Sequence, residues 1–164
     1  MTQENTGTED AFDLDALCAL AERLQQHQSA PGQQQAAPAE AIDVVLAAFL
    51  ARNLRQGGFA QLIFNAQGQY LGEMAKMLQN MNAGNTLHFY EQAVRVCLAD
   101  KAGYQSFLSS DYVGALAVKN PLHEVSMDYY ESSPQFAQEA WPSLSKACVT
   151  ATQWLNENQP EPQA

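Results

Sequence analysis

The sequence predicts an all-α, compact single domain of about eight helices, several of them short. Apolar residues recur three or four positions apart along most of the chain, and the longest unbroken apolar run, 44–51, has eight residues. This spacing is typical of helices with one buried face, and a run of eight is too short to cross a membrane. A chain of 164 residues that is 46% apolar fits one ordinary domain with a core.

The boundaries of the domain follow from changes in composition. Residues 1–9 are polar and are expected to be flexible, the helical domain is expected over 10–157, and 158–164 is expected to be a flexible tail. A Gln-, Ala- and Pro-rich loop is expected at 28–38.

In the first half of the chain, Asp10 or Asp13 can cap the first helix. Gly57-Gly58 is expected to end the second helix, because glycine is favoured just after the last helical turn. The apolar stripes that define four helices fall at 14–24, 42–54, 59–65 and 70–81.

The second half is less regular. A helix is expected from Thr86, which can cap it, to Leu98, and Gly and Ser residues punctuate the stretch after it. Residues 112–118 could form a short strand, but no partner strand of similar character is present. The remaining helices are expected at 122–130, 133–140 and 141–155, with Pro134 and Pro142 each in a first helical turn.

Three cysteines, Cys18, Cys97 and Cys148, stand far apart among apolar neighbours, and the sequence has no CxxC pair. They are predicted to be buried free thiols in a reducing compartment. The first residues lack the basic and apolar stretches of a secretory signal. Both observations predict a cytoplasmic protein.

The chain has 18 acidic and 8 basic residues and a net charge of -10. This balance argues against direct binding to nucleic acid and against docking on an anionic membrane, because both need a positive surface. The charge is -6 over 1–22, zero over 23–100 and -4 over 101–164. Acidic proteins attract basic partners, so the charge favours a protein-binding function.

One acidic row lies in the last third of the chain. Glu124, Asp128 and Glu131 are spaced i, i+4 and i+7, which places them on one helical face, and no Lys or Arg lies between Lys119 and Lys146. A solvated face explains such a row, and so does a surface that imitates DNA phosphates. The row spans about 10 Å. Duplex DNA carries one charge per about 1.7 Å, so imitation would need several acidic helices or two copies of the chain.

No pattern for catalysis or metal binding is present. His123-Glu124 lacks the second histidine of the HExxH zinc motif, and the phosphate-binding loops GxGxxG and GxxxxGK[ST] are missing. The sequence therefore predicts no enzyme, no cofactor and no metal site.

Residues 57–65, GGFAQLIFN, resemble the GGF-x-Q-x-x-F-N motif of a bacterial family of small all-helical proteins. The resemblance covers about 42–83 by motif and the rest by pattern, and the family includes a DNA mimic of the Neisseria type. In this motif the glycines allow a tight turn, the phenylalanines enter the core, and the polar residues can tie neighbouring backbone groups. The structural motif residues are Gly57, Gly58, Phe59, Gln61, Phe64 and Asn65.

The resemblance implies a homodimer whose acidic surfaces imitate the DNA backbone. Such a protein would occupy the DNA-binding face of a transcription regulator of the helix-turn-helix repressor class and prevent its binding to DNA. The motif carries none of the mimicking acids, which are predicted from the charge rows instead. The predicted partner-binding acids are Asp13, Asp15, Glu22, Asp111, Glu124, Asp128, Glu131 and Glu139.

Two other functions fit the same sequence. An acidic adaptor or immunity-type protein would bind a basic protein that does not read DNA. A small enzyme or ligand binder would use the polar residues of the Gln61–Asn65 segment.

Overall fold

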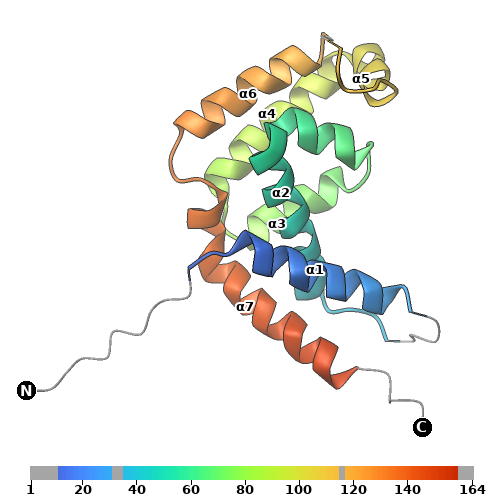
Figure 1. The fold of residues 1–164 in the computed structure, drawn as a ribbon. Helices are drawn as coiled ribbons and strands as arrows, with labels where there is room; N and C mark the ends of the chain where they lie inside the picture. The colour runs from blue at the N-terminus through green and yellow to red at the C-terminus, as the bar shows by residue number, and fades with distance from the viewer. Residues whose placement is uncertain (1–10, 31–34, 115–116, 159–164) are drawn as a thin grey trace, which may run out of the picture.

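The computed structural model describes residues 11–30, 35–114 and 117–158, and within them the chain forms seven helices and no strand (Figure 1). The all-α fold predicted from the apolar spacing is confirmed. The predicted flexible segment 1–9 and residues 159–164 of the predicted tail lie outside the described residues. The helices are α1 (Leu14–Gln28), α2 (Ala39–Ala66), α3 (Leu71–Asn80), α4 (Gly84–Ala99), α5 (Lys101–Leu108), α6 (Lys119–Glu131) and α7 (Phe136–Glu157).

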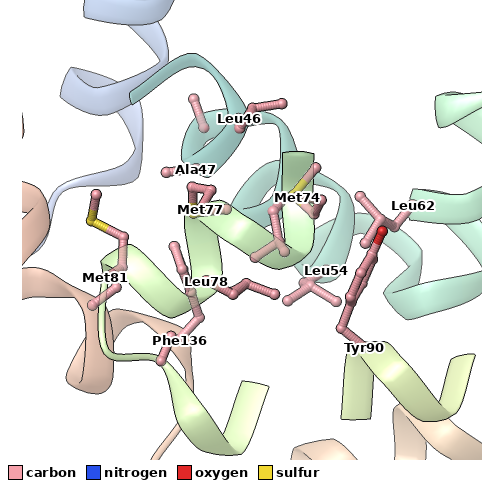
Figure 2. Close-up of a cluster of buried hydrophobic side chains, with 14 of the residues drawn as sticks. Leu46, Ala47, Leu54, Leu62, Met74, Met77, Leu78, Met81, Tyr90 and Phe136 are labelled. Atoms are coloured by element: carbon pink, nitrogen blue, oxygen red, sulfur yellow. The ribbon is translucent and has the colours of Figure 1, made fainter. Parts of the chain in front are cut away.

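The longest helix, α2, is the centre of the fold. It packs against α1, α3, α6 and α7, and Figure 1 shows it running through the middle of the molecule. Figure 2 shows where α2 meets α3, α4 and α7, with Met77 and Leu78 from α3, Leu54 from α2, Tyr90 from α4 and Phe136 from α7. All five side chains are buried. A core of this kind exists because each helix contributes one apolar face.

The break predicted at Gly57-Gly58 is present inside α2. Both glycines have non-helical backbone angles, and Gly58 has φ +69°. The left-handed region suits glycine because a Cβ clashes there with the backbone. A Cβ on Gly58 would also lie 2.7 Å from Ser126 Cβ, so the close approach of α6 requires glycine as well. The predicted helices 42–54 and 59–65 are the two halves of α2.

Three predictions for the second half of the chain were wrong. Residues 101–108 form α5, which the Asp100 side chain caps by accepting from the Gly103 N–H at 2.8 Å. Helix α7 continues through Pro142, because a proline removes only one backbone hydrogen bond and the buried face on either side keeps the helix packed. Thr86 does not cap α4, which begins at Gly84.

The strand considered at 112–118 is absent from the described residues of that segment, whereas 115–116 lie outside them. Tyr112 instead packs its ring against Phe64 and Phe107, with centroids 5.1 and 6.0 Å away. It has φ +69°, which interrupts any extended run.

Replacing Gly58 with alanine should destabilise the protein by about 2–4 kcal/mol, because the left-handed backbone and the contact with Ser126 both resist a Cβ. The matched control is Gly72→Ala in α3, where a Cβ would meet nothing within 4 Å. This control should leave stability unchanged or raise it by up to about 1 kcal/mol. Urea unfolding followed by circular dichroism measures both, and equal stabilities of the two variants would contradict the account of the break.

Candidate protein-binding surface

Helix α6 exposes a row of three acids. Glu124, Asp128 and Glu131 are all exposed, and their spacing puts them on one side of the helix. Among the described residues, no ion pair involves any of them. The base at the start of α6, Lys119, donates to the Tyr112 carbonyl and lies 4.1 Å from the centroid of the Tyr112 ring. The row is therefore uncompensated.

Apolar surface accompanies this row. Met127, between Glu124 and Glu131 in the sequence, is 58% exposed. The neighbours on the opposite side, Leu122 and Tyr129, are buried at 0% and 2% exposure. The outer side of α6 thus combines negative charge with accessible apolar area, a combination that suits contact with another protein.

The inner side of α6 is fixed by the break in α2. A helix that stops and restarts leaves backbone C=O and N–H groups without helical partners. Tyr130 Oη donates to the Leu54 C=O, before the break, and the Phe59 N–H, after the break, donates to Ser126 Oγ at 2.8 Å. Ser126 Oγ also donates to the Leu122 C=O at 2.8 Å. These bonds place α6 against the two halves of α2.

Ser126 and Tyr130 are residues that sequence reasoning missed. The available signal was weak: a serine on an otherwise apolar helical face, four positions after Leu122 and four before Tyr130. Serine at such a position commonly bonds the carbonyl four residues back. What the sequence does not contain is the approach of Gly58, which brings the Phe59 N–H to the same hydroxyl.

The phenylalanines of the GGF motif enter the core as predicted. Phe59 is fully buried, and its ring meets the edge of Tyr129 at a centroid distance of 5.5 Å. Phe64 is half-buried and packs against Phe107 at 5.5 Å. The motif therefore joins α2 to α6 and α5.

The polar residues of the motif have separate local roles. Asn65 Nδ2 donates to Oδ1 of the buried Asn53 at 2.6 Å, and Asn53 Nδ2 donates to the Phe49 C=O at 2.7 Å, so this pair ties the two halves of α2 together. Gln61 lies against the break, where a Cβ on Gly57 would come within 2.9 Å of Gln61 Cβ. A hollow of about 580 Å³ borders Asn65 but not Gln61. The two residues do not converge on one ligand site.

The acids of the first helix are partly engaged. Asp13 caps α1 as predicted, with Oδ1 accepting from the N–H groups of Asp15 and Ala16 at 2.9 and 3.1 Å. Glu22 pairs with Arg52 at 3.4 Å, and both side chains are more than half exposed. Such an exposed pair contributes at most about 1 kcal/mol, but it lowers the local negative charge.

The start of α1 and the end of α6 border the same hollow, of about 390 Å³, which Phe12, Tyr130 and Arg55 help to line. Between α5 and α6, Asp111 is exposed, and its Oδ1 accepts from the Val113 N–H at 3.1 Å.

Glu139 has a structural role that its place in the charge pattern did not indicate. One carboxylate oxygen accepts from the Asn85 N–H at 2.6 Å. The other accepts from the N–H and the hydroxyl of Thr86 at 2.9 and 2.8 Å. These groups belong to the first turn of α4, so Glu139, from α7, caps α4 in place of Thr86. With both oxygens bonded inside the protein, Glu139 is a poor candidate for a partner contact.

The described residues contain no group of three or more His, Cys, Asp or Glu side chains that could hold a metal ion. The helices they form include none that is long and apolar enough to span a membrane.

Cys18, Cys97 and Cys148 are free thiols, and burial raises the pKa of Cys97 to about 11. The Cys97 thiol is therefore protonated and unreactive near neutral pH.

The fold and this surface define a small all-helical protein with an exposed row of acids on α6. A family model described as DMP19-like protein matches residues 35–147, and the chain belongs to this family. The matched residues include the break in α2 and all of α6, whereas α1 lies outside them. The match tests neither the Neisseria type nor the GGF motif, which stay predictions. Searches of curated proteins and of solved structures gave no match.

Replacing Glu139 with alanine should lower stability by about 1–3 kcal/mol, because two backbone N–H groups and a hydroxyl lose their acceptor. The matched control is Glu131→Ala on the exposed row, which should change stability by less than about 0.5 kcal/mol. Thermal unfolding of both variants at neutral pH makes the comparison. If Glu131→Ala destabilises as much as Glu139→Ala, the distinction between capping and surface acids is wrong.

Proposed function

We propose that this chain is an acidic DNA mimic that occupies the DNA-binding face of a transcription regulator and prevents its binding to DNA. The observation that carries the proposal is the uncompensated row of Glu124, Asp128 and Glu131 on α6. Membership of a family named for a DNA mimic protein supports it. A helix-turn-helix repressor is the proposed partner class, because such regulators present a basic surface to DNA phosphates.

Within the proposal, the α6 row is the main contact. It lies inside the residues that match the family, whereas Asp13, Asp15 and Glu22 precede them. Two of those three acids also have partners in the protein, as an N-cap and as an ion pair. Asp111, which lies on the connection into α6 and is exposed, is the proposed extension of the row.

The spacing of the row limits how much DNA one helix can imitate. At 1.5 Å per residue the three carboxylates stand at about 0, 6 and 10.5 Å along α6. A DNA strand places a phosphate every 3.4 Å of helix axis, or about 1.7 Å for both strands. One row is more dilute than a single strand, so we propose that two copies of the chain act together as a homodimer. Complementary charge of this kind mainly accelerates encounter and sets register, so binding should weaken as salt rises.

The rival function that shares this charge is an acidic adaptor for a basic protein that does not read DNA. It predicts the same salt dependence but no competition with duplex DNA. An enzyme or ligand binder built on Gln61 and Asn65 is not proposed, because Asn65 bonds Asn53 and Gln61 packs beside Gly57, and the two side chains do not border the same hollow.

Reversing the row with Glu124→Lys, Asp128→Lys and Glu131→Lys together should abolish capture of a DNA-binding regulator from a nuclease-treated native bacterial lysate at low salt. The three side chains are exposed, so the fold should survive their replacement. The control carries Glu73→Lys, Glu91→Lys and Glu157→Lys, which change the net charge equally at exposed positions away from the row.

The immobilised wild type and control should retain the regulator, as judged by mass spectrometry of the eluate. Equal retention by the row variant would show that α6 is not the contact. Equal loss from the control would show that net charge alone, rather than this surface, holds the partner.

A further inference from the structure

We propose that Ser126 and Tyr130 are positioning residues for the α6 row: they transmit the geometry of the α2 break to the acids that face the partner. This inference rests on the proposed function for its biological meaning, because it assumes that the row is the contact surface. Its structural part concerns only the hydrogen bonds between α6 and α2, and that part can be tested without a partner.

The two residues hold α6 from the side away from the row. With about 100° per residue, Ser126 lies roughly 165° and Tyr130 roughly 125° around the helix from the centre of the row. Ser126 is 3% exposed, so a partner cannot reach its side chain. Any effect of Ser126 on binding must therefore pass through the position of the helix.

The two hydrogen bonds restrict rotation and sliding of α6, which apolar packing alone does not prevent. Phe59 and Phe89 both pack against Tyr129, at centroid distances of 5.5 and 5.6 Å, but apolar contact is not directional and allows a helix to rotate or slide slightly. Hydrogen bonds weaken steeply when their geometry changes. Because Ser126 bonds a backbone group after the break and Tyr130 bonds one before it, rotation or sliding of α6 relative to α2 would change the geometry of these bonds.

Gly58 allows α6 to pack closely against the break. A Cβ added to Gly58 would lie 2.7 Å from Ser126 Cβ and 3.2 Å from Tyr130 Oη. Both α6 residues therefore lie directly against the glycine. The GGF motif thereby gains a functional explanation. It contributes no acid to the surface, yet it specifies the position of the helix that carries the acids.

The test compares Ser126→Ala and Tyr130→Phe with the wild type and with a control, Ala151→Gly. The control destabilises buried α7 by about 1 kcal/mol but leaves the α2 break intact. Residual dipolar couplings of the backbone amides in the full chain report the orientation of α6 relative to α2. Amide hydrogen exchange at Phe59 reports the Ser126 bond directly.

Both variants should change the α6 orientation, and Ser126→Ala should also speed exchange at Phe59, whereas the control should do neither. Unchanged couplings in both variants would overturn the positioning role. Tyr130 is 41% exposed, so Tyr130→Phe keeps the test valid if Ser126→Ala fails to fold.

The second readout is affinity for the regulator captured by the wild type. Both variants should bind it about tenfold more weakly, because charges in the wrong register lose their complementarity. An altered orientation with unchanged affinity would also overturn the proposal. The triple reversal of the row tests the proposed function separately, since it leaves the bonds between α6 and α2 in place.

Discussion

The structure depends most on one interruption of a helix. Gly57 and Gly58 break α2, and the Leu54 C=O before the break and the Phe59 N–H after it bond to side chains of α6. Buried backbone groups must find hydrogen bonds, and α6 supplies both. The same break brings Asn65 back to Asn53, so that α2 folds on itself and offers surfaces to α1, α3, α6 and α7. The glycine at position 58 is what allows α6 to approach α2 closely enough to form these bonds.

Among the described acids, those that cap helices differ from those of the α6 row in what their oxygens bond. Asp13, Asp100 and Glu139 accept from N–H groups in the first turns of α1, α5 and α4. Negative charge at a helix N-terminus is favourable, so these acids contribute to the fold. The α6 row has no such compensation, and its like charges repel one another by a few tenths of a kcal/mol per pair, roughly. A surface that is unfavourable in the free protein is consistent with one that is used by a partner.

Much of the fold could be predicted from the sequence because its determinants are local. Apolar spacing predicted most of the helices, though not α5, and Gly57-Gly58 predicted the break in α2. Residues that act across the chain could not be predicted. Glu139 caps α4 by accepting from Thr86, 53 positions earlier in the sequence. Ser126 accepts from the Phe59 N–H, 67 positions earlier. Sequence therefore assigned Glu139 to the acidic surface and overlooked Ser126. It found the α6 row because i, i+4 and i+7 spacing is itself local, but the exposure of Met127 beside the row needed the structure.

The most direct test of DNA mimicry is displacement of a captured partner by duplex DNA. The chain is immobilised, loaded from nuclease-treated lysate at low salt, and washed with the duplex that the captured regulator recognises or with an equal concentration of a scrambled duplex. If the chain occupies the DNA-binding face, the cognate duplex should release the regulator at a lower concentration than the scrambled duplex. Retention of the partner at saturating cognate duplex would show that the two sites are separate, and would contradict mimicry.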